Sequence, residues 1–93
     1  MATGPEERRY RVDFSRPAAK ELEALPREVQ ARIILRVTEL GDDPRPHGVS
    51  KLQGEDDLYR IRVGKYRVIY TIVDDRLIVT VVRVGDRKDV YRP

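Results

Sequence analysis

The fold is decided by the stretch Leu58-Tyr59-Arg60-Ile61-Arg62-Val63-Gly64-Lys65-Tyr66-Arg67-Val68-Ile69-Tyr70, which predicts a β-hairpin. Apolar and polar residues alternate on both sides of Gly64-Lys65, and glycine supplies the positive φ that such a turn needs. A two-residue turn pairs Arg62 with Arg67 across the two strands. One face of the hairpin then carries Tyr59, Ile61, Val63, Tyr66, Val68 and Tyr70, and the other carries Arg60, Arg62 and Arg67.

The opposed arginines indicate a polyanion as the partner of this face. Like charges directly opposite on neighbouring strands cost stability, so the stability of the fold does not explain why Arg62 is placed opposite Arg67. Residues 1–50 hold 9 Lys/Arg and 9 Asp/Glu, whereas residues 51–93 hold 10 and 7. The positive excess therefore lies in the half with the hairpin, which favours nucleic acid. The alternative is that the arginines pair with Asp86, Asp89 or the acids at 55–57.

Length and composition predict one small cytoplasmic domain. The chain has 93 residues and no cysteine, which excludes disulfides and thiolate metal sites and suits a reducing compartment. No apolar stretch is long enough to span a membrane, and the polar, charged first ten residues do not resemble a signal peptide. We expect residues 1–8 to form a disordered tail and residues 9–93 to form a single domain.

Two helices and two further strands are expected around the hairpin. Tyr10–Phe14 alternates like a half-buried strand, and Ser15 is a plausible N-cap for a short helix that ends at Pro26. A second amphipathic helix follows and is expected to end with Gly41 as its cap. The stretch 77–84 is apolar on both faces and predicts a central strand. The order β-α-α-β-β-β predicts an α+β domain, in which two N-terminal helices pack on an antiparallel four-stranded sheet.

Three short motifs resemble the RelE branch of the RelE/ParE toxins, and the order of elements matches over roughly residues 9–93. The motifs are Lys51-Leu52-Gln53-Gly54, the two hairpin strands, and the ending Arg83-Val84-Gly85-Asp86-Arg87-Lys88-Asp89-Val90-Tyr91-Arg92. The resemblance implies a RelE-like fold and a toxin of a type II toxin–antitoxin pair. Its expected activity is ribosome-dependent cleavage of mRNA in the A site, in which the ribose 2′-OH attacks the adjacent phosphate and leaves a 2′,3′-cyclic phosphate.

The resemblance also assigns the site. It places Arg60 and Arg62 at the strand positions of the catalytic pair, where the best-studied enzyme has lysines. The catalytic set that we expect is Arg60, Arg62, Arg67, Arg87 and Tyr91, and the expected nucleic-acid contacts are Lys51, Lys65, Lys88 and Arg92. The implied partners are a RelB-like antitoxin and the ribosome with its mRNA. A heterotetramer is among the expected forms of the complex with the antitoxin. No membrane, cofactor or metal is expected.

Arginine chemistry leaves the general base open. Arginine matches phosphate oxygens bidentately but scarcely deprotonates at neutral pH. Tyr91 is the best candidate for proton transfer or base stacking, unless it only packs its ring on the sheet. Asp86 stands where many relatives have histidine, and a turn-forming carboxylate is its simpler interpretation. A structural or incidental role is favoured for His47, which lies in a proline-flanked loop.

Two functional alternatives remain at this point. ParE-like relatives share the fold but bind and poison DNA gyrase without cutting RNA. A catalytically weak relative would act only as an antitoxin-binding partner.

Overall fold

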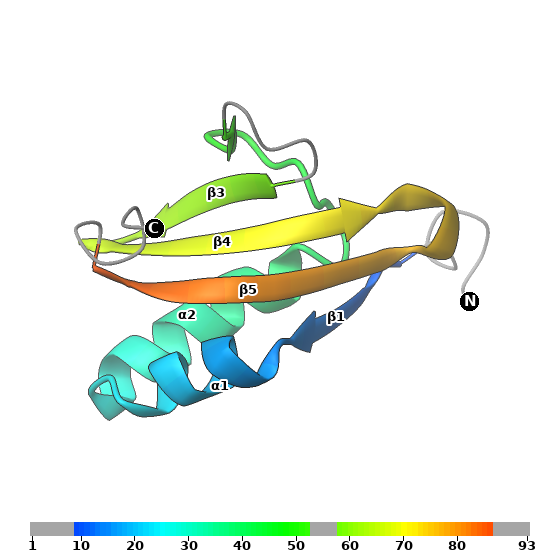
Figure 1. Ribbon diagram of the computed structural model, residues 1–93. Coiled ribbons are helices and arrows are strands. Elements are labelled where there is room, and N and C mark those ends of the chain that lie inside the picture. The colour runs from blue at the N-terminus through cyan, green and yellow to red at the C-terminus, as the bar shows by residue number, and fades with distance from the viewer. Residues whose placement is uncertain (1–8, 53–57, 87–93) are drawn as a thin grey trace, which may run out of the picture.

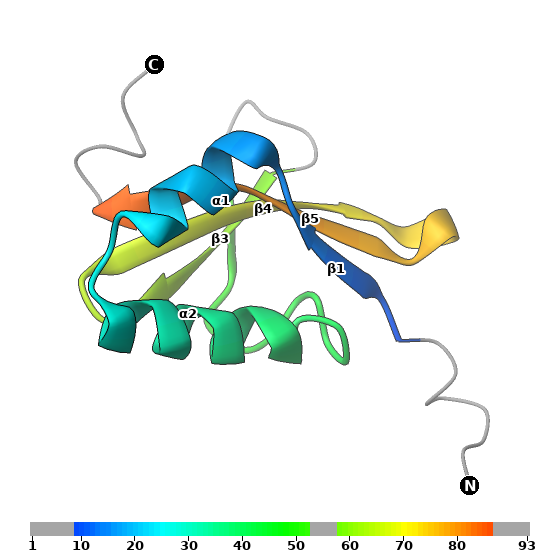
Figure 2. The same ribbon diagram turned by 90° about the horizontal axis from the view of Figure 1, so that it is seen from below.

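The computed structural model describes residues 9–52 and 58–86 and forms two layers. Within these ranges both helices pack on one face of a single sheet, as the two views show (Figure 1, Figure 2). The strand order is β1-β5-β4-β3-β2. The elements are β1 (Arg11–Phe14), α1 (Arg16–Glu23), α2 (Arg27–Glu39), β2 (Ser50–Lys51), β3 (Leu58–Val63), β4 (Tyr66–Val73), the 3₁₀ turn η2 (Asp74–Arg76) and β5 (Ile78–Asp86).

The expected α+β class and the two-helix layer are confirmed, while the sheet differs in two details. It has a fifth strand, β2, whose two residues are too few to show an alternating pattern in the sequence. It is also mixed, because β1 runs parallel to β5 and the other neighbours are antiparallel. The first strand lies at an edge of the sheet, and the connection from β1 to its parallel partner β5 contains both helices and the other three strands, since parallel pairing requires a long crossover.

The hairpin has the predicted register. Val63 pairs with Tyr66, and Arg62 pairs with Arg67. Gly64 has φ +62° at the first turn position, while Lys65 keeps a negative φ, which matches a type II′ turn. The apolar face of the hairpin enters the core, which is mainly aliphatic with one fully buried tyrosine, Tyr70.

The helix ends follow from local chemistry, with one exception. Ser15 caps α1, since its Oγ accepts a hydrogen bond from the Ala18 N–H at 3.2 Å. The expectation that Gly41 caps α2 is wrong in its mechanism: Leu40 is the C-cap, and Gly41 does not adopt positive φ. A Cβ on Gly41 would lie 3.0 Å from the Tyr10 carbonyl oxygen, and the Tyr10 N–H donates to the Gly41 carbonyl at 2.8 Å. Glycine is needed here for close backbone approach.

Helix α1 covers the edge of β5 where β1 ends. Pairing with β1 stops at Val81, and a register irregularity in the β4–β5 ladder follows, beside Tyr70. Beyond it, the Glu21 carboxylate of α1 accepts hydrogen bonds from the Val84 N–H at 2.7 Å and from Arg83 Nε at 3.0 Å. One carboxylate therefore satisfies an edge N–H group and anchors the last part of β5.

A polar cluster at the far end of the sheet, around the β4–β5 turn, links this turn to Tyr10 and to Arg45. The Asp74 carboxylate accepts from both Nη atoms of Arg45, at 3.1 and 2.9 Å, and from the Tyr10 hydroxyl at 2.6 Å. The Arg45 guanidinium also lies 5.2 Å from the centroid of the Tyr59 ring. Hydrogen bonds from Arg45 and then Tyr10 lower the pKa of Asp74 from 3.8 to about 2. This cluster fixes the connection between α2 and β2.

Candidate nucleic-acid interface

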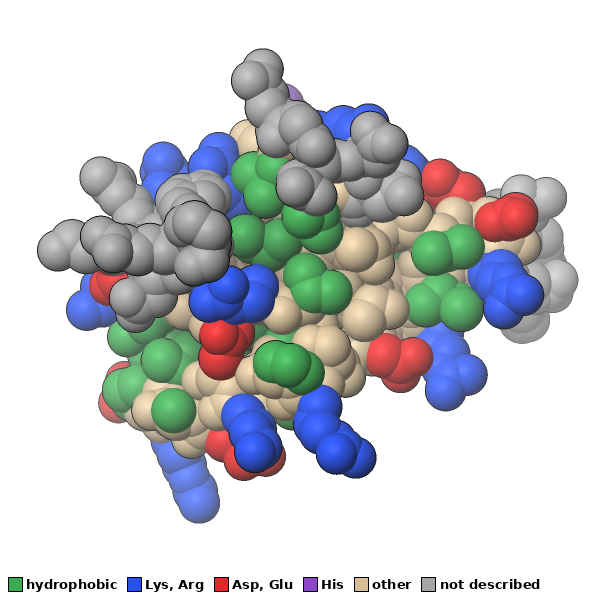
Figure 3. All heavy atoms as spheres, in the orientation of Figure 1, with side chains coloured by type: hydrophobic (Ala, Val, Ile, Leu, Met, Phe, Trp, Pro, Cys, Tyr) green, Lys and Arg blue, Asp and Glu red, His purple; other side chains and the backbone are tan. Residues whose placement is uncertain are grey.

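The three hairpin arginines share the face of the sheet opposite the helices. Their exposure falls from Arg62, which is exposed, through Arg60, which is half-buried, to Arg67, which is only 5% exposed. Arg67 lies between Arg62 on β3 and Gly85 on β5. Because Gly85 has no side chain, it leaves room for the arginine beside it. In the orientation of Figure 1, the space-filling view shows Lys and Arg side chains at the upper side of the molecule, toward β3, and also along its lower and right-hand edges (Figure 3).

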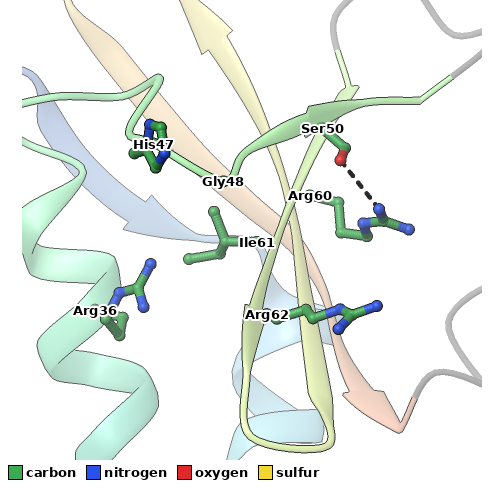
Figure 4. Close-up of a pocket in the computed structure, with 7 residues that line it drawn as sticks. All are labelled: Arg36, His47, Gly48, Ser50, Arg60, Ile61 and Arg62. Carbon is green, nitrogen blue, oxygen red and sulfur yellow. Dashed lines mark hydrogen bonds between the residues drawn. The ribbon is translucent and has the colours of Figure 1, made fainter.

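Arg60 is held in place by the neighbouring short strand. Ser50 is its cross-strand partner, and the Arg60 Nη2 donates to Ser50 Oγ at 3.0 Å (Figure 4). This hydroxyl acceptor helps to fix the direction of the guanidinium, whose planar fork of donors matches an anionic ligand.

A cavity of about 450 Å³ opens beside these arginines. It lies at the outer edge of β3, between the start of β2, the segment before it and α2 (Figure 4). Its lining residues are Arg36, His47, Gly48, Ser50, Arg60, Ile61 and Arg62. Among the residues that the structure describes, three arginines and one histidine line this space and no carboxylate does, so its described lining favours an anion.

The predicted lysine contacts flank the hairpin at its two ends. Lys51 is exposed on β2, with its Nζ 5.9 Å from the centroid of the Tyr59 ring. Lys65 is exposed in the turn, with its Nζ 5.5 Å from the centroid of the Tyr66 ring. Both positions are accessible to a nucleic-acid backbone. Their role as contacts stays a prediction.

The last part of the predicted site lies outside the described residues, as does the predicted tail at 1–8. Its members there are Arg87, Lys88, Tyr91 and Arg92. Asp86, the last described residue, is the cross-strand partner of Tyr66. Cross-strand partners share a face, so Asp86 occupies a register position on the helix side, opposite to Arg67. This register does not favour Asp86 as the base acting at the arginines.

Comparison with known proteins identifies the family. A family model described as the ParE toxin of a type II toxin–antitoxin system, parDE, matches residues 12–91. The chain belongs to this toxin family. It lies on the RelE branch, because it is 33% identical to the mRNA interferase toxin RelE of Escherichia coli (strain K12), over 88% of this chain and 90% of that protein. It is also 30% identical to the toxin RelG of Mycobacterium tuberculosis, over 89% of this chain and 97% of that protein.

Solved structures of this family confirm the RelE-like fold. The toxin–antitoxin complex RelBE2 of Mycobacterium tuberculosis gives a TM-score of 0.76 at 28% identity, covering 85% of this chain and 99% of that chain. The intact RelBE toxin–antitoxin complex of Escherichia coli gives 0.74 at 32% identity, covering 83% and 95%.

Sequence reasoning did not assign three residues of the interface, namely Ser50, Arg36 and His47. Arg36 lies within the amphipathic pattern of α2, and nothing in the sequence marks it as a binding residue. For His47 the sequence favours a structural or incidental role. Their proximity to Arg60 depends on how the α2–β2 connection crosses the end of the sheet. Only the basic, polar composition of residues 45–51 hinted at a site there.

The described side chains are suited to binding and stabilising a phosphate. Arginine donors match phosphate oxygens in a fixed fork, and they stabilise the extra negative charge of a five-coordinate transition state. Arg60, Arg62 and Arg67 do not serve as bases at neutral pH. Proton transfer therefore requires another group.

Proposed function

We propose that this chain is the toxin of a type II toxin–antitoxin pair, and that it cuts mRNA in the ribosomal A site. The observation that carries the proposal is the Arg62–Arg67 pair, placed directly opposite with Arg60 on the same face. Such a pair is unfavourable by itself and is favourable when it binds a polyanion. The name of the RelE relative, mRNA interferase, supports RNA as that polyanion.

The proposed reaction is an internal phosphoryl transfer without a metal. The ribose 2′-oxygen forms a bond to the adjacent phosphorus while the bond to the 5′-oxygen breaks. The upstream fragment keeps a 2′,3′-cyclic phosphate, and the downstream fragment begins with a 5′-hydroxyl. Arg60, Arg62, Arg67 and Arg87 orient the phosphate and stabilise its charge. The ribosome adds rate by holding the 2′-OH in line with the phosphorus.

Tyr91 is assigned to proton transfer or base stacking in this proposal. A phenol with arginines around it is a better proton donor and acceptor at neutral pH than the arginines themselves. Lys51, Lys65, Lys88 and Arg92 are assigned to the RNA backbone, where they add affinity without sequence preference.

The proposed regulator is a RelB-like antitoxin. The structural neighbours include RelB–RelE complexes from Mycobacterium tuberculosis and Escherichia coli. An acidic chain that folds on binding complements the basic half of this protein, and it silences the toxin by covering the arginine face or displacing the Tyr91 segment. A heterotetramer of two toxins and two antitoxins is the proposed assembly, and the cytoplasm is the proposed location.

Expression in bacteria with mapping of mRNA 5′ ends tests this function. We expect cuts in phase with codons, restricted to translated messages. The Arg87→Ala variant should lose these cuts, and Arg27→Ala, a change at an exposed position on α2, should retain them. Intact translated messages in cells that make folded wild-type protein would contradict the proposal.

A ParE-like action on DNA gyrase is the second candidate, because the matching family model is named for ParE. It predicts a DNA damage response with intact mRNA. Supercoiling by purified gyrase would then fall on addition of this protein. A harmless protein that still binds its antitoxin would instead indicate the catalytically weak relative.

A further inference from the structure

We propose that the cavity at the outer edge of β3 binds a phosphodiester of the RNA strand outside the scissile position, with Arg36 and His47 as its contacts. This inference rests on the proposed function, because the RNA reaches the cavity from the arginine face. The site gives the strand a path from one face of the sheet to the other.

Shared residues connect the cavity to the arginine face. Figure 4 shows Arg60 and Arg62 extending to one side of β3, while Ile61 extends to the other side, toward α2. Arg36 on α2 and His47 lie on that second side. The 450 Å³ space therefore continues around the strand edge, and cationic side chains line it on both sides.

Within the described part of the chain, the strand edge is open at this point. β2 pairs only with Tyr59 and Arg60, and no described strand lies against the outer edge of β3 from Ile61 to Val63. Gly48, on the other wall, has φ +92°, and a Cβ there would meet nothing within 4 Å. A ligand can thus pass between the two walls without moving the backbone.

Arg36 is available to such a ligand. Its Nε lies 3.6 Å from Glu39 Oε1, too long for a good hydrogen bond, and both side chains are substantially exposed. An exposed pair of this kind is weak and competes poorly with a phosphate that a second arginine also attracts.

RNA suits this cavity better than an acidic peptide does. Ile61 is the sole aliphatic side chain among the lining residues that the structure describes, so these residues offer a peptide little apolar anchoring. Its other side chains are donors, and two of them already belong to the proposed phosphate-binding face.

Binding of an uncleavable RNA tests the inference. The probe is a fluorescent 12-nucleotide RNA with 2′-fluoro riboses, which lack the attacking hydroxyl. Anisotropy is measured over a series of KCl concentrations for wild type, Arg36→Ala and the matched control Arg27→Ala. We expect Arg36→Ala to weaken binding about 3- to 10-fold at low salt and to reduce the slope of log affinity against log salt by about 0.7, because one phosphate contact is lost. Arg27→Ala should match wild type, and circular dichroism checks that all three are folded.

Equal affinities and slopes for Arg36→Ala and Arg27→Ala would overturn the inference, and so would a wild type that does not bind the probe at the lowest salt. A decapeptide of alternating Glu and Leu is titrated in parallel. If Arg36→Ala impairs peptide binding and leaves RNA binding unchanged, the cavity is a protein-docking surface, and the inference is wrong. Cleavage in cells tests the proposed function separately. If the wild type cleaves mRNA and Arg36→Ala binds the RNA probe as the wild type does, the inference about the cavity is wrong and the proposed function stands.

Discussion

Arg62 and Arg67 face each other across β3 and β4, and each is placed by the turn two residues away. Their positions follow from alternation in the sequence alone, because a two-residue turn permits one register. Their different burial does not follow from it. Arg67 is enclosed because β4 is an inner strand, whereas Arg62 lies on β3 beyond the end of β2.

Replacing Arg62 by Thr should stabilise the domain and inactivate it. The change removes like-charge repulsion at an exposed strand position, which is worth about 0.2–1 kcal/mol. It also removes one phosphate donor, which should lower ribosome-dependent cleavage by about 100-fold. Urea unfolding and a cleavage assay measure the two effects. The control is Arg76→Thr, in η2 at the other end of the sheet, which should change neither stability nor cleavage. A loss of stability in Arg62→Thr would contradict this account.

Replacing Asp74 by Asn should alter how stability depends on pH. The folded pKa of Asp74, about 2, lies below its ordinary value of 3.8, so its ionised form stabilises the fold above that ordinary value. This contribution is lost as the pH falls toward 2. The gap in urea midpoint between wild type and Asp74→Asn should therefore be clear at pH 7 and close toward pH 2. Asp75→Asn, also exposed in η2, is the control, and a gap that stays constant with pH would contradict the prediction.

At the scale of elements, the sequence predicts α1 as a short capped helix on the sheet, but it does not predict the hydrogen bonds of Glu21 to β5. The cap follows from the Ser15 and Pro17 signals, which act within one turn. Glu21 and its partners on β5 are more than 60 residues apart in the chain. They can meet because β1 ends before this part of β5 and leaves its edge accessible to α1. In the same way, β2 is strand because β3 lies beside it.

Replacing Glu21 by Ala should destabilise the domain by about 1–3 kcal/mol, because the Val84 N–H loses its acceptor. Amide hydrogen exchange at Val84 should become faster than in wild type, which locates the loss. Glu23→Ala, at an exposed position of the same helix, should stay within about 0.5 kcal/mol of wild type. Unchanged exchange at Val84 in Glu21→Ala would show that α1 does not anchor β5.

At the scale of the whole molecule, one hydrogen bond ties the core to the connection between α2 and β2. The Tyr70 hydroxyl donates to the Pro44 carbonyl at 2.7 Å in a buried position, and burial raises the pKa of Tyr70 above its ordinary value. Tyr70 also stacks on Tyr59, with ring centroids 5.9 Å apart. The segment that carries His47 and Ser50 is thus held against the sheet from its buried side. No helix within the described ranges meets the length and apolar character that a bilayer crossing requires.

Replacing Tyr70 by Phe should cost about 1–3 kcal/mol, because the buried Pro44 carbonyl loses its donor. Thermal and urea unfolding measure this loss. Tyr66→Phe, on the same strand but half-buried, should change stability by less than about 0.5 kcal/mol. Equal effects of the two changes would show that the hydrogen bond to Pro44 contributes little.

Local sequence patterns were enough to predict the hairpin, its register, the two helices and the three arginines on one face, because turn chemistry, capping and alternation act over a few residues. Long-range packing was needed to establish the parallel pairing of β1, the strand β2, the Glu21 anchor and the cavity where Arg36 and His47 lie beside Arg60. Those features join residues that are far apart in the chain. Which of these residues meet depends on how the helix layer packs on the sheet, and no local sequence pattern encodes that packing.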